Sequence, residues 1–223
     1  MGEMISYPCP DGSTANGYLA KPAKDNAPGI VVIQEWWGLN DQMKKVADRF
    51  AEQGFQALVP DLYKGRVAQD PDEANHMMTG LDWGGAANND IRGAVQYLKQ
   101  GGAKAGVMGF CMGGALTIIA GVHVPETDAC VCFYGIPPKA AADPTKISVP
   151  IQGHFASNDD WCNPEAVNAL EADLKAGGVD HVLYRYEGTQ HAFFNEARPE
   201  VYDQNAAITA WGRTVAFLET HLA

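Results

Sequence analysis

The sequence predicts a single α/β domain with a mainly parallel central sheet and helices on both of its faces. Short apolar, β-branched runs alternate along the chain with segments of helical periodicity. Strands that are buried on both faces of a parallel sheet have this composition. The 223 residues show no internal repeat or composition break, so we expect residues 1–223 to form one domain.

The N-terminal part supplies the first elements. Residues 14–20 alternate as expected for an exposed antiparallel strand, and residues 29–34 form a short apolar run typical of a buried strand. Asn40 and Asp41 offer an N-cap for a helix whose apolar positions, ending at Phe50, share one face.

The same alternation continues to the C-terminus. The expected strands are 55–59, 105–110, 129–134, 149–154 and 182–186. The expected helices are 89–98, 112–121, 164–175 and 201–218. In such sheets ligands bind at the carboxyl ends of the strands, so functional residues are expected directly after them.

Composition limits the partners. The formal net charge is −11, which repels phosphate backbones and anionic lipid, and no local cluster of Lys and Arg offsets it. We therefore expect neither nucleic acid nor a membrane as a partner. No apolar run approaches the roughly 20 residues that span a bilayer, and no secretory signal is recognisable. Five cysteines without CxxC spacing make a reducing, cytoplasmic location the expectation.

The strongest motif follows the expected strand 105–110. Gly109, Cys111 and Gly113 have the spacing of a nucleophile elbow, G-x-S-x-G, with cysteine in place of serine. The N-terminus of the following helix points at the sulfur and favours the nucleophilic thiolate. A buried structural cysteine and a phosphate-binding turn are the alternatives, but the glycines match neither G-x-G-x-x-G nor the Walker pattern, so we expect no nucleotide.

The partners of the nucleophile lie in the order that the α/β-hydrolase fold requires. Asp159 and Asp160 follow the expected strand 149–154, and His191 follows 182–186. His191 would act as the base, and a carboxylate would fix its tautomer. Spacing does not choose between the two aspartates. The other histidines do not follow a strand at the required place, and His154, which ends a strand, is expected to be structural.

Taken together, the chain resembles the dienelactone hydrolase family over nearly its whole length. The matching motifs are Gln34-Glu-Trp-Trp-Gly38, Pro60-Asp-Leu-Tyr63, Gly109-Phe-Cys-Met-Gly-Gly114, His154-Phe-Ala-Ser-Asn-Asp159 and His191-Ala-Phe-Phe-Asn195. The resemblance implies hydrolysis of carboxylic esters without a metal or organic cofactor, and it favours Asp159 as the acid.

The resemblance also implies roles around the nucleophile. Glu35 would contact the resting thiol until substrate displaces it, although a surface or loop-capping role is the alternative. Backbone N–H groups of Trp36 and Met112 would form the oxyanion hole.

One position departs from the family pattern. Family members that act on dienelactone hold its carboxylate with arginines, one of them four residues beyond the catalytic histidine, where this chain has Asn195. Arg198 and, more remotely, Arg66 are the nearest replacements, out of register. Aromatic side chains near the motifs are candidate pocket residues: Trp36, Trp37, Trp83, Phe110, Trp161 and Phe193.

We therefore expect a cysteine-nucleophile hydrolase of small carboxylic esters or lactones that forms an acyl-enzyme and is a monomer or small homo-oligomer. A thioesterase or acyltransferase on the same fold, a redox-sensing protein, and an inactive ligand-binding relative are the alternatives. The natural substrate is left open by the sequence.

Overall fold

A computed structural model describes residues 2–223 and confirms the predicted fold class. Eight strands form one sheet in the order β1-β2-β4-β3-β5-β6-β7-β8, in which β3 to β8 run parallel while β1 and β2 pair antiparallel at one end. The strands are β1 Glu3–Pro8, β2 Thr14–Ala20, β3 Gly29–Ile33, β4 Gln56–Pro60, β5 Ala105–Phe110, β6 Ala129–Phe133, β7 Ile151–Asn158 and β8 His181–Gln190.

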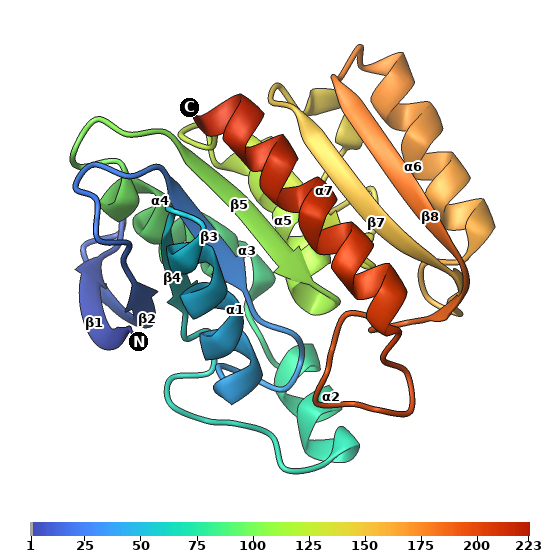
Figure 1. The fold of residues 1–223 in the computed structure, drawn as a ribbon, viewed down its shortest axis with the longest axis horizontal. Coiled ribbons are helices and arrows are strands. Elements are labelled where there is room, and N and C mark those ends of the chain that lie inside the picture. Colours follow the sequence, from blue (N-terminus) through green and yellow to red (C-terminus); the bar gives the residue numbers. More distant parts are fainter. Residues whose placement is uncertain (1) are drawn as a thin grey trace.

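Helices cover both faces of this sheet (Figure 1). The helices are α1 Asp41–Glu52, α2 Pro71–Thr79, α3 Trp83–Gly85, α4 Arg92–Leu98, α5 Met112–His123, α6 Pro164–Ala176 and α7 Gln204–Leu222. A π-helical stretch, Ala86–Ile91, joins α3 to α4, and a 3₁₀ turn covers Pro144–Lys146. One apolar cluster packs α1 and α7 against the sheet, and a second packs α4, α5 and α6 against the other face.

Local sequence explains where the helices begin. The Asn40 side chain accepts a hydrogen bond from the Met43 backbone N–H and so caps α1, whose Val46 and Phe50 are buried. Asp203 caps α7 in the same way through the Ala206 N–H. Both caps satisfy N–H groups that have no acceptor within the helix.

The structure corrects several predicted elements. β2 lies between β1 and β4 and its second half is buried, so the expectation of an exposed strand was wrong. Neither β1 nor α2 was predicted, because their short polar sequences carry weak periodicity. The helix expected at 89–98 begins earlier, at Trp83, and α7 begins at Gln204, after its aspartate cap.

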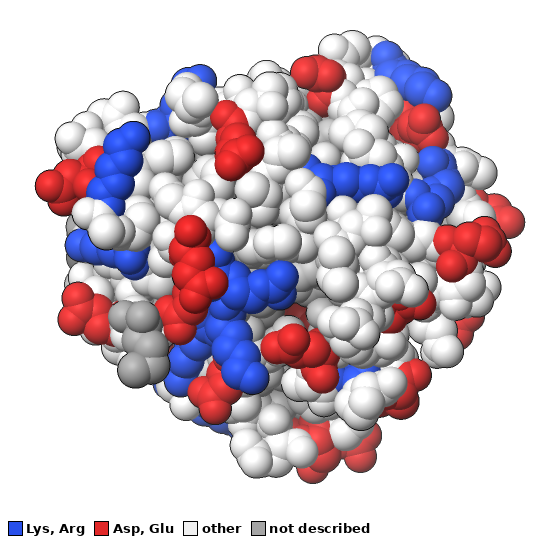
Figure 2. Space-filling model, in the orientation of Figure 1, with Lys and Arg blue, Asp and Glu red and all other residues white. Residues whose placement is uncertain are grey.

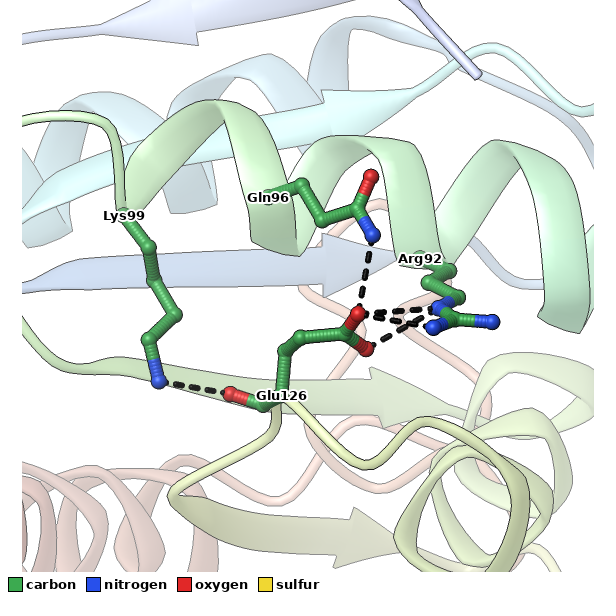
Figure 3. Close-up of polar contacts among 4 residues, drawn as sticks. All are labelled: Arg92, Gln96, Lys99 and Glu126. Atoms are coloured by element: carbon green, nitrogen blue, oxygen red, sulfur yellow. Dashed lines mark hydrogen bonds and ion pairs between the residues drawn. The ribbon is translucent and has the colours of Figure 1, made fainter. Parts of the chain in front are cut away.

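Ion pairs connect α4 to the loop before β6 at the end of the sheet where β5 and β6 begin (Figure 3). Arg92 on α4 binds the Glu126 carboxylate through Nε and Nη2, at 2.8–3.1 Å, and Gln96 donates to the same carboxylate. Lys99 donates to the backbone carbonyl of Glu126 and pairs with Asp128 at 2.7 Å. Asp128 in turn accepts the backbone N–H of Ala105, the first residue of β5.

On the face that carries α1 and α7, a contiguous group of basic side chains lies over α1 and is bordered by acidic ones (Figure 2). Figure 2 shows basic and acidic side chains interspersed there, with mostly uncharged surface along α7. Within residues 2–223 no helix is both long enough and apolar enough to cross a bilayer.

Candidate active site

Cys111 occupies a strained turn between β5 and α5. Its backbone lies at φ 55° and ψ −115°, a region that non-glycine residues rarely adopt. Backbone contacts on both sides hold it there: its N–H donates to Phe133 O at 3.0 Å, and its carbonyl accepts from the Ala115 N–H at 3.1 Å. A Cβ at Gly109 would overlap the backbone of Gly113, which explains why glycine is needed at this position of the motif.

Asp159 and His191 come together from the ends of β7 and β8. Nδ1 of His191 lies 2.7 Å from Oδ2 of Asp159, and the aspartate side chain is only 1% exposed. Oδ1 of Asp159 accepts the backbone N–H groups of Trp161 and Cys162. Since a carboxylate can only accept, Nδ1 of His191 carries hydrogen and Nε2 is left for another partner. Asp160, by contrast, is exposed.

The protonation of His191 is set by competing effects. Burial by itself would lower its pKa, but the hydrogen bond and negative charge of Asp159, together with the neighbouring Cys111 side chain, raise the pKa to about 10. For Asp159, burial would raise the pKa, and the contacts with His191 and the loop N–H groups lower it. Both shifts favour the charged forms of this pair.

Glu35 follows β3 and is buried beside these residues. Tyr134 Oη donates to its Oε1 at 3.3 Å, and Asn195 Nδ2 donates to its Oε2 at 2.7 Å. Burial raises the pKa of Glu35 against the opposing effect of these hydrogen bonds. Asn195 Oδ1 accepts the Ala197 N–H, which fixes the amide so that its donor side faces Glu35.

A cavity of about 490 Å³ joins the reactive side chains. Its polar side chains are Glu35, Cys111, His191 and Arg198. Its remaining wall is apolar, made of Trp36, Met78, Trp83, Pro138, Trp161 and Ala192. The volume falls within the range of about 300–1,000 Å³ typical of small-molecule sites.

The predicted pocket residues divide into two groups. Trp36, Trp83, Trp161 and Arg198 line the cavity, whereas Trp37, Phe110, Phe193 and Asn195 do not. These four make other contacts. Trp37 packs against Trp36, and Phe110 lies in a cluster with Phe133 and Phe194. Phe193 contacts Tyr134 and Tyr186. Asn195 is bound to Glu35.

A second hollow of about 550 Å³ contains none of the predicted catalytic residues. It is lined mainly by polar side chains of the segment after β4, of α2 and of the turn between β1 and β2. Arg66 lies there, paired with Glu73 at 3.2 Å, and so does not line the cavity that holds Cys111. The cavity with Cys111 is therefore the candidate site.

Tyr134 belongs to the site although no motif pointed to it. It directly follows β6, has φ 37°, and brings its hydroxyl to Glu35 and its ring to 5.1 Å from the His191 ring. Its place at the carboxyl end of a central strand was the only available signal. Met78, Pro138 and Ala192, which line the cavity, were also not predicted.

His154 is structural, as its position at the end of a predicted strand suggested. It is fully buried, and its Nε2 donates to Gln152 Oε1 at 2.9 Å, which leaves Nδ1 to accept from Tyr186 Oη at 2.7 Å. Burial, aided by the Arg213 charge, lowers its pKa to about 3. The residue is therefore a neutral part of the core.

Comparison with known proteins identifies the family of this chain. Residues 15–222 match the family model described as "Dienelactone hydrolase family". The chain belongs to the dienelactone hydrolase family. This confirms the predicted resemblance and makes the protein a dienelactone hydrolase-like ester or lactone hydrolase, an enzyme of the carboxylic ester hydrolase class.

Relatives of this dienelactone hydrolase family member match over full length. "Protein usf" of Aquifex pyrophilus is 38% identical and "Putative carboxymethylenebutenolidase" of Aquifex aeolicus is 34% identical, each match covering 100% of both chains. Among solved structures, a dienelactone hydrolase-like promiscuous phosphotriesterase from metagenomic libraries has a TM-score of 0.83 at 22% identity, covering 100% of this chain and 99% of that one. That likeness is one of fold.

Proposed function

We propose that this family member hydrolyses small carboxylic esters or lactones through a Cys111–His191–Asp159 triad and an acyl-enzyme. One observation carries the proposal: His191 lines the same cavity as Cys111, while its Nδ1 lies 2.7 Å from Oδ2 of Asp159. A nucleophile, a base and a carboxylate that orients the base are the parts that acyl transfer requires.

The first half of the reaction makes a thioester. The Cys111 proton passes to Nε2 of His191, and the sulfur attacks the carbonyl carbon. Met112 is the first residue of α5, so its backbone N–H has no acceptor within the helix. With the N–H of Trp36 it would hold the oxyanion. The imidazolium then protonates the leaving oxygen as the carbon–oxygen bond breaks.

The second half releases the acid. His191 takes a proton from water, the hydroxide attacks the thioester carbonyl, and the sulfur leaves. Asp159 keeps Nδ1 protonated and stabilises the imidazolium in both halves. The raised pKa of His191 favours the imidazolium that forms in each half of the reaction.

Glu35 has a part in the resting state. Its carboxyl lines the cavity with Cys111 and is held by Asn195 and Tyr134. We assign it the role of facing the thiol until the substrate carbonyl takes its place. Burial raises the pKa of Glu35, and this favours a neutral carboxyl in the cavity that holds the thiol.

The test is the kinetics of 4-nitrophenyl acetate hydrolysis. Cys111→Ala should reduce kcat/KM by about 10³-fold or more. Cys9→Ala, a buried cysteine beside Gly93 on α4, is the matched control and should retain wild-type kinetics. Acid-quenched wild type should carry one acetyl group on Cys111 by mass spectrometry. Hydrolysis by Cys111→Ala at the wild-type rate would overturn the proposal, and transfer to added alcohols or thiols faster than to water would replace it with an acyltransferase.

A further inference from the structure

We infer that the natural substrate is an uncharged ester or lactone with an apolar, preferably aromatic, substituent. This inference rests on the proposed function, because it names what the site around Cys111 accepts. The observation that carries it is the wall of the cavity, which three tryptophans line, while a carboxylate lies beside its arginine and hydrogen-bond donors hold its glutamate.

The tryptophans offer apolar surface. Trp83 Nε1 donates to the backbone carbonyl of Met78 at 3.2 Å, so the one polar atom of this side chain is satisfied within the protein. Trp36 packs edge-on against Trp37, with ring centroids 5.4 Å apart. Trp161 is exposed, and its ring centroid lies 5.7 Å from that of His191. Flat aromatic walls bind flat apolar groups through area burial and ring packing.

The charged groups in the wall lie beside groups that offset or accept part of their charge. The carboxyl of Glu35 accepts from Asn195 and Tyr134. The guanidinium of Arg198 donates through Nε to Glu200 at 2.8 Å, and this carboxylate offsets the arginine charge. A substrate carboxylate would have to lose its hydration in a mostly apolar cavity, where Glu200 offsets the charge of Arg198 and Asp159 offsets that of His191, which is unfavourable.

The segment of α2 and α3 supplies the selective part of the wall. Met78 and Trp83 lie on this segment, between β4 and α4, and reach the cavity from outside the sheet. The catalytic residues follow strands of the sheet instead. Met78 and Trp83 therefore come from other elements than the reacting groups, so a change on this segment can alter substrate choice while leaving the reacting groups in place.

The experiment compares matched esters of 4-nitrophenol. The pentanoate and the mono-glutarate differ by a terminal methyl against a terminal carboxylate, and the 3-phenylpropanoate adds a ring. We expect kcat/KM for the pentanoate to exceed that for the glutarate by about tenfold or more, and the phenylpropanoate to be the best of the three. Hydrolysis of the glutarate as fast as or faster than that of the pentanoate would overturn the inference. If Arg198→Gln then lost this activity on the glutarate, Arg198 would be identified as an anion-binding group.

Variants locate the selectivity. Trp83→Leu should lower kcat/KM for the phenylpropanoate by about tenfold, chiefly through KM, and lower that for the acetate much less. Trp211→Leu, a half-buried tryptophan on α7 that does not line the cavity, is the matched control and should leave the ratio of the two esters unchanged. Equal losses on both esters in Trp83→Leu would contradict the assigned role.

A binding measurement separates this inference from the proposed chemistry. Calorimetry on Cys111→Ala with the anilides of pentanoic acid and of glutaric acid monoanion measures recognition without turnover. Tighter binding of the neutral anilide, with no Cys111-dependent hydrolysis of any ester, would refute the triad proposal and support the inference. Tighter binding of the charged anilide would refute the inference whatever the kinetics.

Discussion

Strands β5 and β6 have charged or reactive groups at both ends, and the two sets differ in how they are partnered. Where the strands begin, Arg92 pairs with Glu126 and Lys99 with Asp128, with about one third of each side chain exposed (Figure 3). Where they end, Cys111 has a strained backbone and Tyr134 reaches the buried carboxyl of Glu35.

The pKa shifts at the two ends differ in sign for the same residue type. For Glu126, burial would raise the pKa, but the hydrogen bonds from Arg92 and Gln96 outweigh it and lower the pKa. For Glu35, burial prevails over the hydrogen bonds from Asn195 and Tyr134, and the pKa is raised. A paired, partly hydrated carboxylate supports folding at neutral pH, whereas a buried one retains a proton at a cost to stability once it ionises. The difference shows which end holds the chain together and which is arranged for chemistry.

The largest effect should come from the carboxylate that orients His191. Asp159→Asn should lower kcat on 4-nitrophenyl acetate by about 10²–10⁴-fold, because the imidazole loses its fixed tautomer and its countercharge. Asp160→Asn changes an exposed neighbour and should be close to wild type. A larger loss in Asp160→Asn than in Asp159→Asn would reverse the assignment of the acid.

A smaller, pH-dependent effect on stability should come from Glu35→Gln. Because the folded pKa of Glu35 is raised, its stabilising contribution is present below the unfolded pKa and is lost as pH rises through the folded value. Relative to wild type, Glu35→Gln should therefore become progressively more stable as pH increases from acidic to neutral. Denaturant unfolding at several pH values measures this, and a difference independent of pH would contradict it.

Glu126→Gln should show the opposite sign. Its lowered pKa means that the carboxylate stabilises the fold above the unfolded pKa, and that this contribution disappears as pH falls through the folded pKa. At neutral pH the variant should be less stable than wild type, and at acidic pH the two should converge. Unfolding free energies of Glu35→Gln and Glu126→Gln, measured over the same pH range, compare the two carboxyls directly. The same pH trend in both variants would contradict the opposite pKa shifts.

The smallest effect should come from Arg92→Met. The ion pair with Glu126 is bidentate but about one-third exposed, so its loss should cost about 0.5–1 kcal/mol of unfolding free energy, and less in high salt. The esterase kinetics should not change, because the pair lies at the opposite end of β5 from Cys111. A loss of kcat without a loss of stability would show that the two ends are coupled.

Much of the fold could be predicted because its signals are local. Apolar β-branched runs identified the buried strands, and the G-x-C-x-G spacing identified the turn at Cys111. The order of elements then placed Asp159 and His191 at the carboxyl ends of β7 and β8, where the structure brings them to 2.7 Å. The predictions that were wrong concern segments with weak periodicity: β1 and α2 were not predicted, and β2 was expected to be exposed.

The sequence by itself determined the α/β order of elements and the strained turn that places the Cys111 thiol at a helix N-terminus. It also determined that Asp159 and His191 follow later strands. Each of these features depends on the residues next to it in the chain. Only the tertiary structure decided that Asn195 holds Glu35, 160 residues away, and that Trp83 lines the cavity while Trp37 does not. Those outcomes depend on how distant elements pack, and a side chain's neighbours across a sheet or cavity leave no periodic trace along the chain.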